Sequence, residues 1–132
     1  MKTNTYVLLA ASILLVLTAI SLVTYQAPQV TLIQPSEYEA VAASAVVIDV
    51  YKPGQQPLSN TDYQIPYDDL EALQAAIPTK NTPVLLYCKG GVTSAQASKQ
   101  LLEAGYSEVY ELAGGTRAYR EQTVAASSCQ AR

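Results

Sequence analysis

The chain of 132 residues contains no histidine, and this absence excludes several classes of chemistry. Without histidine, a single chain cannot assemble a Ser-His-Asp or Cys-His catalytic group, and most types of zinc site are excluded as well. Only two cysteines are present, Cys88 and Cys129, which is too few for a disulfide scaffold. Their separation along the chain matches no metal-binding spacing, so we expect neither a metal nor another cofactor.

Basic residues are also scarce. Lys and Arg number 8 against 11 Asp and Glu, which gives a formal net charge of −3, and the basic residues form no run along the sequence. Binding to nucleic acid depends on neutralising phosphates with a basic patch. We therefore expect no nucleic-acid partner.

Charge is absent from residues 6–25, which read YVLLAASILLVLTAISLVTY. This run has the length of about 20 apolar residues that a membrane-spanning helix needs, and Lys2 before it favours delivery of the rest of the chain across the membrane. A cleaved secretory signal is the alternative, because Ala19 and Ser21 suit a cleavage site. We therefore expect residues 1–27 to be a signal peptide or a transmembrane anchor. The protein would then be periplasmic or otherwise extracytoplasmic, and would contact the membrane if the segment is not cleaved.

The rest of the sequence alternates between strand and helix patterns. Residues 45–50 (AVVIDV) and 83–87 (PVLLY) are aliphatic runs typical of strands buried on both faces. Further strands are expected at 30–33, 63–65 and 108–112, and helices at 35–43, 68–77, 94–104 and 116–124. This order predicts an α/β fold with a mostly parallel five-stranded sheet covered by helices on both faces. The domain is expected to occupy residues 28–125, followed by a polar tail, 126–132, that holds Cys129.

The loop that follows the 83–87 strand is the main functional candidate. It reads CKGGVT from Cys88 to Thr93, at the carboxyl end of a strand, where ligands bind in sheets of this kind. The glycine pair 90–91 allows a tight turn with inward-facing N–H groups, and Thr93 is predicted to cap a helix whose start adds further N–H groups. Such a nest lowers the pKa of a thiol, so Cys88 is expected to be a nucleophile. A merely structural buried cysteine, the alternative, would not need this cradle.

Several separated motifs, in their order, resemble those of the rhodanese-like sulfurtransferase family. The stretch from Pro83 to Tyr119 is similar to the second half of a family member, with the Cys loop, a helix ending at Ala-Gly-Tyr and a Gly-Gly turn before the last helix. Residues 46–50 (VVIDV) resemble the family strand that carries an aspartate, here Asp49. The resemblance covers about Val30 to Tyr119.

The resemblance implies a two-step sulfur transfer. Cys88 would attack the outer sulfur of a small anionic donor such as thiosulfate, become a persulfide, and pass that sulfur to a thiol or cyanide-like acceptor. The substrate-binding residues would be those of the loop: Lys89, Gly90, Gly91, Val92 and Thr93. Their N–H groups would stabilise the thiolate and the persulfide, and Lys89 would help to attract the anion. Asp49 would be a structural carboxylate near the loop. Many members have Arg at the position of Thr93, so we expect a less cationic pocket here.

Three other functions compete with this one. A Cys-loop phosphatase would need an Arg at the end of the loop to bind phosphate through two hydrogen bonds, and Thr93 cannot supply them. A thiol-disulfide redox protein would pair Cys88 with Cys129, as export to an oxidising compartment would favour. A non-enzymatic module would bind a sulfur compound or a partner protein through the same pocket; the missing Arg favours this alternative, whereas the retained Cys88 argues against it.

Overall fold

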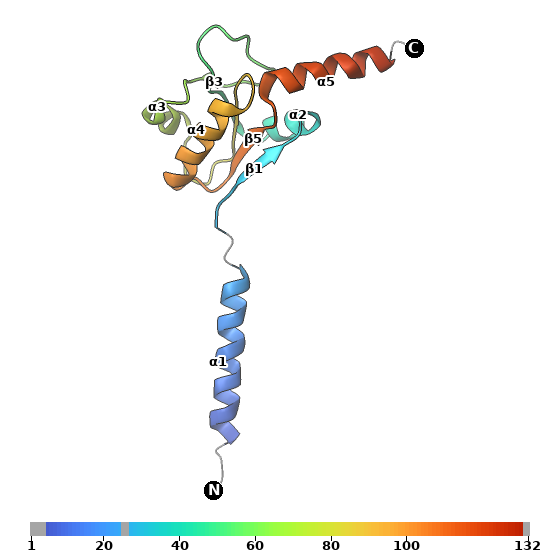
Figure 1. Cartoon of the computed structure of the whole chain (residues 1–132). Coiled ribbons are helices and arrows are strands. Elements are labelled where there is room, and N and C mark those ends of the chain that lie inside the picture. Colours follow the sequence, from blue (N-terminus) through green and yellow to red (C-terminus); the bar gives the residue numbers. More distant parts are fainter. Residues whose placement is uncertain (1–4, 25–26, 131–132) are drawn as a thin grey trace.

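The computed structural model describes residues 5–24 and 27–130, with side chains described for 6–17 and 27–130. A five-stranded sheet lies at the centre of the domain (Figure 1), and every pair of neighbouring strands in it is parallel. The strand order is β1-β5-β4-β2-β3, and the bounds are β1 Val30–Ile33, β2 Val46–Asp49, β3 Tyr63–Gln64, β4 Val84–Tyr87 and β5 Val109–Leu112. The predicted α/β fold with a five-stranded parallel sheet is confirmed.

Helices cover both faces of the sheet. The helical elements are α1 Thr5–Thr24, the 3-10 helix η1 Pro35–Glu37, α2 Tyr38–Ala42, α3 Leu70–Ala76, α4 Val92–Glu103 and α5 Gly115–Gln130. One core cluster joins α3 and α4 to one face of the sheet, through side chains such as Leu73 and Leu101. The other joins α2 and the start of α5 to the opposite face, with Tyr38 fully buried. Successive residues of β4 alternate between the two clusters, as the pleat of a strand requires.

Three predicted helix boundaries are wrong. Helix α3 begins at Leu70 rather than at residue 68, because Asp69 caps it with a carboxylate that accepts a hydrogen bond from the N–H of Ala72 at 3.0 Å. Helix α4 begins at Val92, before Thr93, because Gly91 serves as the N-cap. Helix α5 does not end near residue 124 but continues through most of the expected polar tail to Gln130, because this stretch contains neither Gly nor Pro to end it.

The N-terminal hydrophobic helix expected before the domain is present as α1, which stands apart from the domain in Figure 1 and exposes its large apolar side chains between Tyr6 and Leu17. Within the described part of the chain, no helix combines the length and the hydropathy needed to cross a membrane. The span expected over residues 6–25 extends to residue 25, which lies outside the described residues. The expected location outside the cytoplasm stays a prediction from the sequence.

The central strand β4 provides a test of how the core is packed. Leu86 is fully buried between the sheet and α4, so Leu86→Ala is expected to lower the free energy of unfolding by about 2–5 kcal/mol, through lost burial and the cavity left behind. Leu32→Ala removes the same atoms from a side chain that is 59% exposed on the edge strand β1, and is expected to cost about 0.5 kcal/mol or less. Urea unfolding of both variants checks the difference, and equal losses would contradict this packing.

Candidate active site

Cys88 lies directly after the carboxyl end of β4, as the sequence predicts, and only 2% of its surface is exposed. Its Sγ accepts a hydrogen bond from the N–H of Gly91 at 3.0 Å. The same sulfur lies 3.5 Å from the hydroxyl oxygen of Ser94, which in turn donates to Oε1 of Glu111 at 2.9 Å. The sulfur is therefore held by a backbone donor on one side and by a buried polar chain on the other.

The loop reverses direction through one glycine rather than two. Gly91 has φ of +95°, a left-handed conformation that strains other residues, and it caps α4. Gly90 has no positive φ, and a side chain there would meet only the end of the Arg117 side chain, at 3.9 Å. Of the predicted glycine pair, Gly91 is therefore the residue whose conformation forms the turn and directs an N–H group at the sulfur.

The start of α5 holds the loop from the opposite side. The N–H of Thr116 donates to the carbonyl oxygen of Cys88 at 2.9 Å, and the N–H of Arg117 donates to that of Lys89 at 3.2 Å. Gly115 makes this approach possible, with φ of +60°. Any side chain at Gly115 would overlap the Cys88 carbonyl oxygen and would come within 2.9 Å of the Lys89 carbonyl oxygen. The carbonyl oxygens of Cys88 and Lys89 thus point at α5, so the N–H groups of the same two peptide units point away from α5.

These surroundings lower the pKa of the Cys88 thiol. Burial alone would raise this pKa, but the hydroxyls of Ser94 and Thr93 and the N–H groups of Ser94 and Gly90 favour the thiolate and outweigh it. Thr93 Oγ1 is buried and makes no hydrogen bond of good geometry in the described part of the chain, so it acts on the thiolate as a nearby dipole. For Glu111, burial raises the pKa of the carboxyl group and only the Ser94 hydroxyl opposes this.

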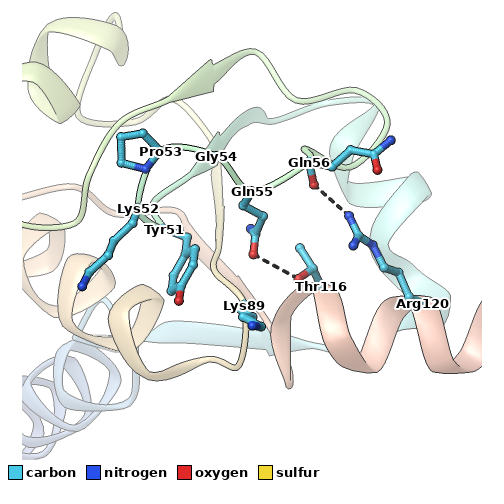
Figure 2. A pocket seen from close by; sticks show the side chains of 9 residues that line it. All are labelled: Tyr51, Lys52, Pro53, Gly54, Gln55, Gln56, Lys89, Thr116 and Arg120. Carbon is cyan, nitrogen blue, oxygen red and sulfur yellow. Dashed lines mark hydrogen bonds between the residues drawn. The ribbon is translucent and has the colours of Figure 1, made fainter.

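A pocket of about 510 Å³ lies beside the Cys loop (Figure 2). Its walls come from the segment after β2, from Lys89 and from the start of α5; the lining residues are Tyr51, Lys52, Pro53, Gly54, Gln55, Gln56, Lys89, Thr116 and Arg120. Two hydrogen bonds join these walls, from Thr116 Oγ1 to the Gln55 side chain at 3.3 Å and from Arg120 to the Gln56 carbonyl oxygen at 2.8 Å. Three cations and no acidic side chain line the pocket.

Not all of the predicted substrate-binding residues lie at the pocket. Lys89 lines the pocket, whereas the side chain of Val92 is 70% exposed at the start of α4. Asp49 is buried and accepts hydrogen bonds from the N–H of Tyr51 and from the Gln55 side chain. It therefore acts as the expected structural carboxylate, by holding the segment that forms one wall of the pocket.

The sequence interpretation missed four residues of the site. Lys52 and Arg120 supply positive charge from outside the loop, so the pocket is more cationic than Thr93 alone suggests. Ser94 and Glu111 form the buried polar chain behind the sulfur. Of these, only Glu111 had a usable signal, because it is an acidic residue inside an otherwise apolar strand. Among the described residues, no group of three or more His, Cys, Asp or Glu side chains is placed to hold a metal ion.

A disulfide between Cys88 and Cys129 within one chain is not compatible with this structure. Thr116 binds the carbonyl oxygen of Cys88, and Cys129 lies thirteen residues further along the same helix α5. At the rise of an α-helix this places Cys129 about 20 Å from the site, whereas a disulfide needs Cα atoms within about 7 Å. Both cysteines are free thiols, with Cys88 buried and Cys129 exposed. The redox alternative that pairs them is therefore wrong for this arrangement.

Comparison with known proteins identifies the family. The chain matches the family model described as Rhodanese-like domain over residues 34–122, which is more than half of its length. The chain therefore belongs to the rhodanese-like domain family, and the resemblance seen in the motifs is confirmed.

Curated relatives and solved structures agree with this assignment. A tRNA uridine(34) hydroxylase from Picosynechococcus sp. is 34% identical over 104 residues, which cover 78% of this chain and 32% of the relative. The enzyme of that name from Chlamydia pneumoniae is 44% identical over 52 residues, covering 39% of this chain and 16% of the relative. The chain thus spans about a third or less of these relatives.

Among solved structures, the human single domain sulfurtransferase TSTD1 has a TM-score of 0.57 at 21% identity, over 67% of this chain and 94% of that one. A rhodanese homolog from Thermus thermophilus has a TM-score of 0.53 at 29% identity, over 67% of this chain and 99% of that one. The first of these likenesses concerns the fold alone.

Gly115 tests whether the start of α5 shapes the Cys loop. Gly115→Ala is expected to push the loop away from α5, lower the melting temperature and slow alkylation of Cys88 near neutral pH, because the N–H groups leave the sulfur. Gly105→Ala is the matched control, since Gly105 has φ of +92° with nothing within 4 Å of an added Cβ. This control is expected to cost only the strain of a left-handed residue, about 1–2 kcal/mol, without a change in alkylation. Identical behaviour of the two variants would refute the close contact.

Proposed function

We propose that this protein is a sulfurtransferase that carries a sulfane sulfur on Cys88. The observation that carries the proposal is the hydrogen bond of 3.0 Å from the Gly91 N–H to the Cys88 sulfur, at a loop that opens directly into helix α4. A thiolate is stabilised there without histidine, and the chain has none. Membership of the rhodanese-like family supports the same chemistry.

The proposed reaction has two steps. In the first, the Cys88 thiolate attacks the outer sulfur of the donor, a new S–S bond forms, and the S–S bond of the donor breaks, so that sulfite leaves with the electron pair when the donor is thiosulfate. In the second, a thiol or cyanide-like acceptor takes the outer sulfur and returns Cys88 to its thiolate form. The loop N–H groups and the buried Thr93 hydroxyl, which has no hydrogen-bond partner among the described residues, are available to stabilise the negative charge as it moves from the inner to the outer sulfur.

The donor is proposed to be an anion. Lys52, Lys89 and Arg120 line the pocket beside Cys88 without an acidic neighbour in its lining, in a chain whose net charge is −3. A concentration of positive charge in one concave region attracts and retains small anions. The relatives named for hydroxylation of a tRNA uridine are about three or more times as long as the matched part, and the acidic charge of this chain does not favour an RNA substrate.

Replacement of the proposed nucleophile tests the function directly. Cys88→Ser is expected to abolish cyanide-dependent transfer of sulfur from thiosulfate, because a serine hydroxyl is too weak a nucleophile in this site, while Cys129→Ser is expected to keep the wild-type rate. After treatment with thiosulfate, mass spectrometry is expected to find one added sulfur, about 32 Da by the mass of the atom, on the peptide that contains Cys88.

Two results would point elsewhere. Sulfur transfer that persists in Cys88→Ser would contradict the proposal. A wild-type protein that binds thiosulfate without acquiring the additional sulfur would instead indicate the non-enzymatic sulfur-binding module.

Removal of the pocket's lysines tests the anionic donor. The double variant Lys52→Gln/Lys89→Gln is expected to raise KM for thiosulfate by roughly threefold to tenfold with a smaller change in kcat, since each exposed charge contributes at most about 1 kcal/mol. Added salt is expected to narrow the difference from wild type, because it screens exposed charges. Lys99→Gln is the control, since Lys99 pairs with Glu103 on α4 and does not line the pocket. An equal increase in KM for the Lys99→Gln control would show that the charges in the pocket have no special role in binding thiosulfate.

A further inference from the structure

A buried chain of three polar groups runs from the sulfur into the sheet. Cys88 Sγ lies 3.5 Å from Ser94 Oγ, and Ser94 Oγ lies 2.9 Å from Glu111 Oε1. The exposed fractions of these residues are 2% for Cys88, 0% for Ser94 and 7% for Glu111. The chain is therefore shielded from water, and its members have one another as hydrogen-bond partners.

Glu111 is unusual among the acidic residues of this protein. Only Asp49 and Glu111 are buried carboxylates in the described part of the chain. Asp49 is occupied by the Tyr51 N–H and the Gln55 side chain, at the wall of the pocket. Burying a carboxylate is costly unless it is well bonded, and the partner of Glu111 is the serine that touches the sulfur.

The hydroxyl of Ser94 can pass a proton in either direction. It accepts a hydrogen bond from the thiol of Cys88 and donates its own proton to Glu111 in the arrangement described above. Because a hydroxyl is both donor and acceptor, the reverse arrangement fits the same atoms: a protonated Glu111 donates to Ser94, and Ser94 donates to the thiolate. The two arrangements differ only in the positions of two protons.

We infer that Cys88 and Glu111 share one proton through the Ser94 hydroxyl, so that a single negative charge lies either on the sulfur or on the carboxylate. The thiol gives its proton to Ser94 Oγ while the Ser94 proton moves to Glu111, and the total charge is unchanged. Ser94 touches the reacting sulfur, whereas Glu111 acts through Ser94 and is a positioning residue. This network provides in a chain without histidine the proton acceptor that histidine would supply.

The electrostatics of the two groups favour sharing. Burial raises the pKa of Glu111, and the loop donors lower the pKa of Cys88 despite burial, so the two values move toward each other. Other titratable side chains on the surrounding segments are Asp49, Tyr51, Lys52, Tyr87, Lys89, Lys99, Glu103, Glu108, Tyr110, Arg117 and Arg120. In the part of the chain that the structure describes, none of these side chains hydrogen-bonds to a side chain of the Cys88, Ser94 and Glu111 network.

The shared proton itself does not depend on the proposed function, but the part that it plays in sulfur transfer does. When Cys88 attacks the donor as a thiolate, its proton is stored on Glu111, so the incoming anion does not face a carboxylate as well. When the acceptor removes the sulfur, Glu111 returns the proton through Ser94 to the released thiolate. The buried network therefore carries one negative charge before and after each turnover.

Alkylation tests the shared proton without any sulfur donor. In a Cys129→Ser background, the rate of Cys88 alkylation by iodoacetamide is followed against pH, since the rate reports the thiolate. Glu111→Gln keeps the size and the hydrogen bond to Ser94 but cannot hold the charge or the proton. The alkylation midpoint is expected to fall by about one pH unit, which raises the rate on its acid side about tenfold, because the competing carboxylate is gone. Glu108→Gln, an exposed change at the other end of the same segment, is expected to leave the midpoint unchanged.

The direction in which the alkylation midpoint moves distinguishes proton sharing from a purely structural role of Glu111. Damage to the loop would return the thiol toward its ordinary pKa and raise the midpoint, so an unchanged or raised midpoint in Glu111→Gln overturns the inference. Ser94→Ala is expected to raise the midpoint, and to reduce the effect of Glu111→Gln to less than half in the double variant. A full effect in the double variant would also overturn it. Because alkylation needs no persulfide, failure of sulfur transfer and failure of proton sharing are separate results.

Discussion

The first N–H groups of α5 bind the carbonyl oxygens of Cys88 and Lys89, and the geometry of the site depends on this contact. A peptide group cannot direct both its oxygen and its N–H at the same side. With these two carbonyl oxygens bound by α5, the loop turns through Gly91, whose N–H donates to the sulfur. The contact requires that the chain at residue 115 has no side chain, so the shape of the Cys loop depends on Gly115.

The same contact joins the Cys loop to the neighbouring pocket. Helix α5 starts under the Cys loop and, one turn later, places Arg120 opposite Lys52 in the segment after β2. Asp49 and Gln55 hold that segment in place from the end of the neighbouring strand. Cations from three distant parts of the sequence are thereby concentrated in one region of a protein whose overall charge is negative. The loop has Thr93 where an Arg would add positive charge, and Lys52 and Arg120 from other parts of the fold add positive charge to the pocket instead.

The sequence was informative where structure is decided locally. The aliphatic runs identified β2 and β4, and the strand, cysteine and glycine order placed Cys88 at a helix start. It was wrong about the first residue of α4, because the left-handed Gly91 replaced Thr93 as the cap. It could not show that Lys52 and Arg120 line one pocket, or that Glu111 lies behind the Cys88 sulfur, since these positions depend on strand order and helix direction. The spacing of the two cysteines also did not show that Cys129 lies at the far end of α5, whose first turn contacts Cys88.

Gly90 differs from the two glycines that shape the loop, and the difference concerns which substitutions the loop can accept. Its backbone is unstrained for other residues, and the space above it ends only at the flexible Arg117 side chain. A new side chain at position 90 would lie toward the Arg117 side chain, while the Gly91 N–H and the Ser94 hydroxyl would stay at the sulfur. Position 90 can therefore accept a side chain at little structural cost, whereas a left-handed backbone favours glycine at positions 91 and 115, and at 115 the nearby carbonyl oxygen of Cys88 excludes any side chain.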